Sequence, residues 1–234
     1  MIQLPIKTVA LDGDDTLWHN ETRFHLTQAA LRELLRRHVP DADIDRHLSD
    51  VEMRNLSMYG YGIKAFTLSM LETAIQVTEG RIPTADLDVI LGWGKKMLGE
   101  PTELLDGVEE ALRDLNGRYE LLLITKGDLF DQESKLARSG LAEMFSGVEI
   151  LSEKNEGAYR SVLRRRLIDP GEFVMVGNSL RSDIAPVVAI GARGVHIPYP
   201  LTWHHEQVPE AKMPREGWYR LERISELGVL LDAL

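Results

Sequence analysis

The 234-residue chain contains no cysteine, and this absence excludes several kinds of chemistry. Disulfide bonds, thiolate nucleophiles and cysteine-ligated zinc sites cannot occur. No apolar run approaches the roughly 20 residues that a membrane-spanning helix needs. Residues 1–7 also lack the basic start, the apolar stretch and the small-residue cleavage site of a signal peptide. From these absences we expect a cytoplasmic protein that does not enter a membrane.

Basic residues are in the minority, with 27 Lys and Arg against 37 Asp and Glu, so the formal net charge is −10. Nucleic-acid affinity depends on clustered Lys and Arg, and we therefore expect no nucleic-acid partner. The densest basic run, residues 164–166, falls at the end of a predicted helix. There the helix dipole and the solvent explain it better than a binding patch does. A small phosphorylated substrate remains compatible, because it responds to the charge of a local pocket.

Short apolar runs alternate with helical patterns through much of the chain. Residues 8–11 predict a buried strand that ends at acidic residues and glycine. Further strands are predicted over residues 121–124, 148–151, 173–176 and 194–197. Helices are predicted between or after them over residues 108–116, 129–139, 155–167 and 181–190. This alternation implies right-handed crossovers and an α/β fold with a doubly wound parallel sheet.

The segment from about residue 22 to residue 98 has a different pattern and contains no comparable strand. Its second part, residues 87–98, places apolar residues at i, i+3, i+4 and i+7, as an amphipathic helix does. An insertion after the first strand leaves the sheet at the edge where such sheets bind ligands, so it can act as a lid. We therefore expect an α-helical cap domain and an α/β core domain, at residues 21–99 and at residues 1–20 with 100–234.

Polar residues follow the first four predicted strands. They are Asp12, Asp14 and Thr16 after the first strand, Thr125, Lys126 and Gly127 after the second, and Asn178 and Asp183 after the fourth. Lys154 comes just past the third strand. Because the carboxyl ends of parallel strands meet at one edge of the sheet, we expect these groups to converge. Carboxylates brought together repel unless a cation joins them, and hard oxygen ligands favour Mg²⁺.

This arrangement resembles the haloacid dehalogenase superfamily, and the resemblance covers nearly the whole chain. The first family motif is a strand followed by Asp-x-Asp-x-Thr, and the fourth is usually Gly-Asp-x₃₋₄-Asp. The second is a Thr or Ser that closes a strand, and the third is a lysine ahead of a helix. In chain order, the four motifs match Asp12 with Asp14 and Thr16; Thr125; Lys154; and residues 177–183. The resemblance implies a Rossmann-like core, an inserted helical cap and the activity of a phosphatase.

The resemblance also implies a role for each matched residue. Asp12 would attack phosphorus in line and form an aspartyl-phosphate. Asp14 would protonate the leaving oxygen and then deprotonate the attacking water. Thr125 and Lys154 would hold phosphoryl oxygens, with Lys154 supplying charge where charge accumulates. Three further residues are expected on the substrate side: Thr16, Lys126 and Gly127.

The implied cofactor is Mg²⁺, which would bridge Asp12 and a phosphoryl oxygen. The backbone carbonyl of Asp14 and the side chain of Asp183 would complete its protein ligands. Asn178 stands where the family usually has an acid, and this leaves open whether Asn178 or Asp183 is the direct ligand. Asp15 stands where family members more often have glycine, and we expect it to order the loop rather than to take part in catalysis.

Several functions are compatible with these motifs. Retention of Asp14 argues against dehalogenation, because the dehalogenase branch replaces this residue. A phosphomutase keeps both aspartates, and a catalytically weak binding or regulatory protein is compatible with Asn178. We predict a Mg²⁺-dependent phosphohydrolase that acts on a small phosphorylated metabolite as a monomer or a homodimer. For residues 204–206 (His-His-Glu) we predict a surface loop, because neighbouring residues rarely aim their side chains at one ion.

Overall fold

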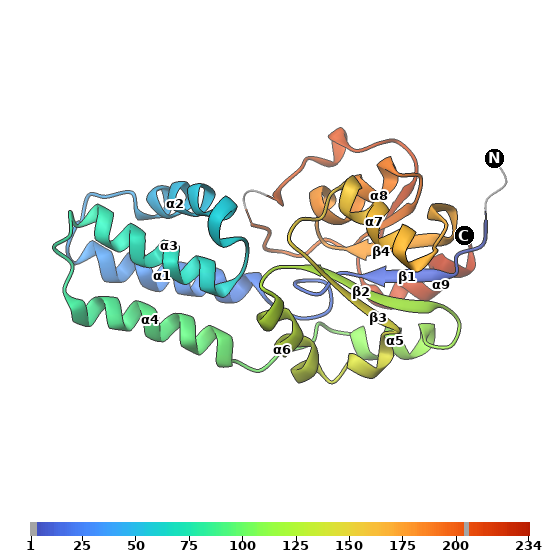
Figure 1. The fold of residues 1–234 in the computed structure, drawn as a ribbon, viewed down its shortest axis with the longest axis horizontal. Coiled ribbons are helices and arrows are strands. Elements are labelled where there is room, and N and C mark those ends of the chain that lie inside the picture. The colour runs from blue at the N-terminus through green and yellow to red at the C-terminus, as the bar shows by residue number, and fades with distance from the viewer. Residues whose placement is uncertain (1–3, 204–205) are drawn as a thin grey trace. The chain divides into compact units, whose positions relative to one another are not determined.

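The computed structural model describes residues 4–203 and 206–234 (Figure 1). Their contacts divide the chain into two compact units. The first unit comprises the described parts of residues 1–21, 102–126 and 134–234, and the second comprises residues 22–101 and 127–133. None of the described helices is both long and apolar enough to cross a membrane.

The described residues of the first unit form a six-stranded parallel sheet with the strand order β3-β2-β1-β4-β5-β6. The strands are β1 (Thr8–Leu11), β2 (Glu120–Lys126), β3 (Gly147–Leu151), β4 (Phe173–Gly177), β5 (Arg193–His196) and β6 (Trp218–Arg220). β1 lies between β2 and β4, and Ala10 stands opposite both Leu122 and Met175. The predicted doubly wound parallel sheet is confirmed, and Asp12 follows one of its inner strands.

Helices pack on both faces of this sheet (Figure 1). They are α5 (Val108–Leu115), α6 (Leu129–Ser139), α7 (Glu156–Arg166), α8 (Ala185–Ala189) and α9 (Leu227–Asp232). Successive strand residues point to opposite faces. Val9 and Leu11 of β1 share a buried cluster with residues of α5, α6 and α9, whereas Ala10 shares one with residues of α7 and α8. The sheet is therefore covered on both sides, as its apolar strands require.

The described residues of the segment 22–101 in the second unit contain four helices, the first of which begins one residue earlier; this agrees with the helical pattern predicted for the segment. They are α1 (Glu21–Arg36), α2 (Ile44–Tyr59), α3 (Ile63–Val77) and α4 (Thr84–Gly99). Their buried faces form an apolar core that includes Leu35, Leu48, Met70 and Ile90. Asp43 caps α2, because its carboxylate accepts a hydrogen bond from the Arg46 N–H at 3.2 Å.

One predicted helix is wrong in its form. Instead of a single helix over residues 181–190, the chain makes a π-helical turn, Leu180–Ile184, and then the short helix α8. Pro186 has no N–H and cannot donate to the carbonyl of Ser182, four residues earlier. The buried hydroxyl of Tyr159 donates to that carbonyl instead, at 3.1 Å. The turn changes the path of the chain at the residues of the fourth motif.

The end of the chain holds two further elements that the sequence patterns did not predict. β6 has three residues and pairs in parallel with β5, with Val195 opposite Tyr219. A three-residue strand is too short to show an alternating pattern. The helix α9 follows and packs Leu227 and Leu231 against the sheet.

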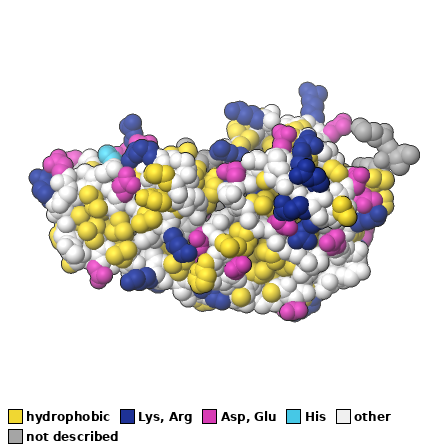
Figure 2. All heavy atoms as spheres, in the orientation of Figure 1, with side chains coloured by type: hydrophobic (Ala, Val, Ile, Leu, Met, Phe, Trp, Pro, Cys, Tyr) yellow, Lys and Arg dark blue, Asp and Glu magenta, His cyan; other side chains and the backbone are white. Residues whose placement is uncertain are grey.

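Charges of both signs are distributed over the surface, and Figure 2 shows acidic and basic side chains near one another on the face drawn. The basic run at residues 164–166 forms the last turn of α7. Arg165 and Arg166 both pair with Glu149, at 2.5 and 2.9 Å. Position at a helix C-terminus and an acidic partner therefore account for this run.

Candidate active site

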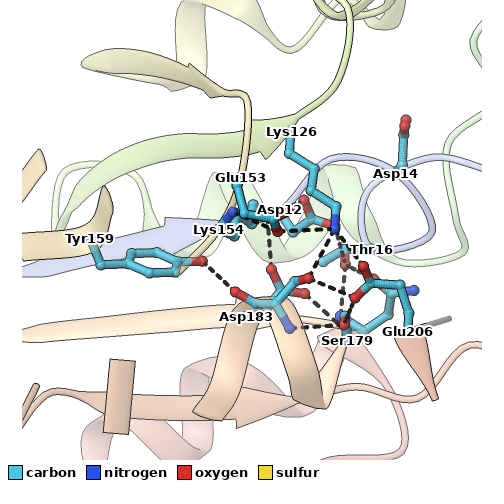
Figure 3. Close-up of polar contacts among 12 residues, drawn as sticks. Asp12, Asp14, Thr16, Lys126, Glu153, Lys154, Tyr159, Ser179, Asp183 and Glu206 are labelled. Atoms are coloured by element: carbon cyan, nitrogen blue, oxygen red, sulfur yellow. Dashed lines mark hydrogen bonds and ion pairs between the residues drawn. The ribbon is translucent and has the colours of Figure 1, made fainter. Parts of the chain in front are cut away.

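A lysine and two aspartates that follow separate strands lie together, and the lysine contacts both aspartates (Figure 3). The Lys154 Nζ atom donates hydrogen bonds to Asp12 Oδ1 at 2.5 Å and to Asp183 Oδ1 at 2.7 Å. Asp12 follows β1, Lys154 lies between β3 and α7, and Asp183 lies in the turn after β4. Their side chains are between 1 and 10% exposed. The parallel sheet thus joins residues that are far apart in the sequence.

The charges in this cluster are unequal, because two carboxylates share one ammonium group. Burial raises the pKa of Asp12 to about 7; Lys154 opposes this shift, and the charge of Asp183 adds to it. Burial alone would lower the pKa of Lys154, but the two carboxylates outweigh it and raise that pKa above its usual value. With both carboxylates ionised, the cluster has two negative charges and one positive charge, and a further cation would balance the second carboxylate.

Thr16 links the loops of the first and fourth motifs. Its Oγ1 atom lies 3.4 Å from Asp12 Oδ2 and 3.4 Å from Asn178 Oδ1, and it accepts a hydrogen bond from the Asn178 N–H at 3.1 Å. One buried hydroxyl thus brings the oxygens of Asp12 and Asn178 close together. These contacts of Thr16 are with protein groups, and its contact with a substrate stays a prediction.

Gly177 allows Asp183 to reach the cluster. A Cβ atom at position 177 would lie 2.2 Å from Asp183 Oδ2, which is shorter than any real contact. The same oxygen accepts a hydrogen bond from the Ser179 N–H at 2.9 Å. The glycine of the fourth motif is therefore required by the close approach of the aspartate six residues later.

Asp14 lies apart from the Asp12 cluster in Figure 3. It has its own set of hydrogen-bond partners. Its Oδ1 atom accepts a hydrogen bond from Trp18 Nε1 at 2.7 Å. The Lys135 Nζ atom donates to both Asp14 oxygens, at 2.9 and 3.0 Å, and to Asn20 Oδ1 at 2.8 Å. Lys135 is 4% exposed and belongs to no recognised motif, so the sequence did not point to it.

Asp15 orders the loop, as expected, and its backbone has a conformation that favours glycine. Its φ angle is +61°, in the left-handed region that glycine adopts freely. Its carboxylate accepts hydrogen bonds from the N–H groups of Asn20, at 2.8 Å, and Glu21, at 3.0 Å. Burial raises the pKa of Asp15 to about 8, and the charge of Asp14 adds to the shift.

A second cluster joins Lys126 to the segment that follows β5 (Figure 3). The Lys126 ammonium group pairs with Glu206 and donates to Ser182 Oγ at 3.0 Å. Glu206 also accepts hydrogen bonds from Ser179 Oγ at 2.5 Å and from Ser182 Oγ at 2.6 Å. Burial would raise the pKa of Glu206, but Lys126 and the serine hydroxyls hold it below its usual value. The predicted surface loop at residues 204–206 is thus tied to the site through Glu206, while His204 and His205 lie outside the described residues.

The remaining predicted residues follow the same strand end. Thr125 is 1% exposed, and because Leu11 stands opposite Leu123, Thr125 lies level with the loop that holds Asp12. Gly127 has a φ angle of +142° and belongs by its contacts to the second unit. The structure thus gathers Asp12, Thr16, Thr125, Lys126, Lys154, Asn178 and Asp183 at one edge of the sheet.

The oxygens of Asp12, Asn178 and Asp183 form a donor set that suits a hard cation such as Mg²⁺. Two of them are carboxylates held beside each other, and the third is an amide. Within the described residues, no group of three or more His, Cys, Asp or Glu side chains is arranged to hold a metal ion. The set formed by Asp12, Asn178 and Asp183 contains two acids and one amide.

The parallel sheet and the polar clusters at its strand ends can be compared with a family model. The model described as "Hydrolase: haloacid dehalogenase-like hydrolase" matches residues 6–191, so the chain belongs to the haloacid dehalogenase-like hydrolases. A haloacid dehalogenase-like family hydrolase from Xanthomonas campestris is 40% identical, with a TM-score of 0.87, and the alignment covers 97% of this chain and 91% of that one.

Two further relatives differ in activity. N-acylneuraminate-9-phosphatase from Mus musculus is 27% identical over 172 residues, which make up 70% of this chain and 66% of that protein. The chain thus spans just under two thirds of that relative. The structure of 2-haloacid dehalogenase from Pseudomonas syringae pv. Tomato is 22% identical, with a TM-score of 0.63 over 97% of this chain and 99% of that one. This last likeness shows the fold alone.

Proposed function

We propose that this hydrolase is a Mg²⁺-dependent phosphomonoesterase that works through an aspartyl-phosphate. The observation that carries the proposal is a buried Asp12, held by Lys154 at the end of an inner strand, with a second aspartate, Asp14, two residues further on. An Asp12 oxygen forms a bond to phosphorus as the bond from phosphorus to the leaving oxygen breaks. Water then releases inorganic phosphate and restores the Asp12 carboxylate.

Lys154 and Thr125 stabilise the phosphoryl group in this proposal. Lys154 supplies a fixed positive charge next to Asp12, where a phosphate dianion would otherwise be repelled. Thr125 lies at the adjacent strand end and offers a hydroxyl to a phosphoryl oxygen. Asp14 donates a proton to the leaving oxygen and then takes one from the attacking water.

Asp12, Asp183, the Asn178 amide and the Asp14 backbone carbonyl would hold Mg²⁺. When bound, this ion neutralises the repulsion between the Asp12 carboxylate and the phosphate. Two buried carboxylates that share one ammonium group support a site for such a cation. Because one position is an amide, we expect the ion to be held less tightly than by three acids.

Asp14 favours a phosphatase over a dehalogenase. A departing alkoxide needs a proton, whereas a departing halide is stable without one, so a second acid serves only the phosphate reaction. The relative from Mus musculus carries the name of a phosphatase, which supports the same choice. We infer that the substrate is a small phosphorylated metabolite.

The test is a screen of phosphomonoesters that includes 4-nitrophenyl phosphate and N-acylneuraminate 9-phosphate, with release of inorganic phosphate as the readout. We expect turnover with Mg²⁺ and none with EDTA, and Asp12→Asn should lower kcat by about 10⁴-fold or more, since it removes the nucleophile. Asp50→Asn, an exposed aspartate of α2, is the matched control. Equal turnover in EDTA, or full activity of Asp12→Asn, contradicts the mechanism, and an isomerised product without free phosphate identifies a phosphomutase.

A further inference from the structure

Lys135 is the second buried lysine of the first unit and is not part of the cluster around Asp12. It is 4% exposed, on the part of α6 that groups with the sheet. A buried ammonium group needs a counter-charge and hydrogen-bond acceptors, or it destabilises the fold by several kcal/mol. Asp14 provides the charge and Asn20 provides a further oxygen.

The contacts fix the orientation of the Asp14 carboxylate. Lys135 approaches both of its oxygens almost equally, at 2.9 and 3.0 Å, and Trp18 Nε1 adds a third hydrogen bond at 2.7 Å. The Trp18 indole is itself fully buried, and its backbone carbonyl accepts a hydrogen bond from the Asp15 N–H at 2.7 Å. Both donors are therefore held by the core, and a carboxylate with two such donors has little rotational freedom.

We propose that Lys135 is a positioning residue for proton transfer by Asp14, and that Trp18 assists it. The proposal rests on the proposed function and adds a residue that no motif of the chain contains. Asp14 stands apart from the Asp12 cluster in Figure 3, as suits a group that serves the leaving oxygen rather than the phosphoryl oxygens. Orientation of this kind contributes to rate because a general acid acts only within hydrogen-bond reach of the oxygen it protonates.

Lys135 neither gains nor loses a proton in the two steps of the reaction. In the first step the Asp12–phosphorus bond forms, the bond from phosphorus to the leaving oxygen breaks, and the Asp14 proton moves to that oxygen. In the second step water attacks phosphorus, its proton moves to the Asp14 carboxylate and the Asp12–phosphorus bond breaks. Lys135 stays protonated throughout and donates its hydrogen bonds to whichever form of Asp14 is present.

Substrates with different leaving groups can distinguish a positioning role of Lys135 from a purely structural role. 4-Nitrophenolate departs as a stable anion and needs little protonation, whereas a simple alkyl phosphate releases an alkoxide that must receive a proton. A residue that positions Asp14 therefore matters for the alkyl ester and much less for the aryl ester. A residue that only stabilises the fold affects both esters equally. We compare kcat/KM, because it reports steps up to the departure of the leaving group.

For Lys135→Met we expect kcat/KM to fall by about 10²-fold with an alkyl phosphate and by less than about threefold with 4-nitrophenyl phosphate. Lys135→Arg keeps the charge and the donors and should recover part of the loss with the alkyl ester. Trp18→Phe removes one hydrogen bond and should act in the same direction but less strongly. Lys7→Met, which removes an exposed lysine paired with Glu172, is the matched control and should change neither value.

Equal losses with both esters, or no loss with either, would overturn the proposal. Asp14→Asn is measured alongside, so that a wrong role for Lys135 can be distinguished from a wrong role for Asp14. If Asp14→Asn discriminates strongly between the esters and Lys135→Met does not, Lys135 has no positioning role and the proposed function stands. If Asp14→Asn itself fails to discriminate, the assigned role of Asp14 is wrong, and the inference on Lys135 falls with it.

Discussion

The first unit and the helical segment of residues 22–101 differ in the side chains that they bury. In the first unit, charged side chains are buried at one edge of the sheet: Asp12, Asp15, Lys135, Lys154 and Asp183. Among the described residues of the segment 22–101, the buried polar side chains are uncharged: Asn55, Ser69, Thr73 and Thr78. A buried charge costs several kcal/mol unless it is paired and hydrogen-bonded. The first unit therefore contains buried charges that need partners, whereas the described residues of the segment 22–101 bury only uncharged polar side chains.

Ion pairs of similar length therefore contribute differently to stability in the two units. Lys154 and Asp12 are almost completely excluded from solvent, with side chains 2% and 10% exposed. In the helical unit, Arg32 and Asp45 are also 2.7 Å apart, but their side chains are 32% and 42% exposed. Water screens the exposed pair, so its contribution to stability is small. The comparison predicts that the effect of removing a charged partner falls as its exposure rises.

The largest effect is expected for Lys154→Met. It leaves Asp12 and Asp183 side by side without their shared cation, and removing one partner of a buried pair costs about 3–5 kcal/mol of unfolding free energy. Activity should fall by about 10³-fold, because the charge that stabilises the phosphoryl group is lost. Urea unfolding in EDTA and turnover of 4-nitrophenyl phosphate measure the two effects.

Lys7→Met is the control for this prediction. Lys7 pairs with Glu172 at 2.7 Å, much like Lys154 with Asp12, but its side chain is 65% exposed. We expect a change of less than about 1 kcal/mol, as for other surface pairs. Similar losses of stability in the two variants would break the proposed dependence on burial.

An intermediate effect is expected for Glu206→Gln, since the Glu206 side chain is 13% exposed. The variant keeps an oxygen for Ser179 and Ser182 but removes the charge that faces Lys126. Lys126 then loses its closest counter-charge, and we expect kcat/KM for 4-nitrophenyl phosphate to fall by about tenfold, the effect of a charged hydrogen bond.

A double mutant tests whether this effect passes through Lys126. If it does, Lys126→Met combined with Glu206→Gln is no worse than the more severe single variant. Glu210→Gln is the matched control, because Glu210 lies in the same segment and pairs with the exposed Arg220 instead. Independent, additive losses in the double mutant would show that Glu206 acts without Lys126.

The sequence predicted those parts of the fold and the site that depend on short stretches of chain. The first motif places Asp12, Asp14 and Thr16 within five residues, directly after an apolar strand. The helices predicted over residues 129–139 and 155–167 are present as α6 and α7. Gly140, with a φ angle of +74°, follows the end of α6, and Asn155 caps the start of α7. Each of these features is determined by the backbone and its immediate neighbours.

The features that the sequence did not predict depend on contacts between distant residues. Lys135 is 121 positions from Asp14, and Lys126 is 80 positions from Glu206. One local signal did exist for Lys135. Asp131, Gln132 and Lys135 occupy one side of α6 together with the buried Leu136, and polar residues on the core-facing side of a helix need partners. The identity of those partners follows only from the sheet topology.

The smallest effect is expected for the exposed pair of the helical unit. Burial would raise the pKa of Asp45, but hydrogen bonds from Arg32 and Gln28, together with the charge of Arg32, hold it below its usual value. A lowered pKa stabilises the folded state at pH values above the unfolded-state pKa, which is about 4. That contribution is lost as the pH falls through the lower, folded-state value. Asp45→Asn should therefore cost about 0.5 kcal/mol at pH 7, a figure already reduced for solvent screening.

Urea unfolding of the native protein and of Asp45→Asn, at neutral pH and again below the lowered folded-state pKa of Asp45, measures this difference. The two proteins should differ at neutral pH and converge in acid, because Asp45 is then protonated in both states. Asp50→Asn, whose partner Arg46 is 4.0 Å away and exposed, should show no difference at either pH. If the Asp45→Asn difference persisted in acid, the pair would act through packing rather than charge. A cost as large as that of Lys154→Met would mean that burial does not govern the weight of ion pairs in this protein.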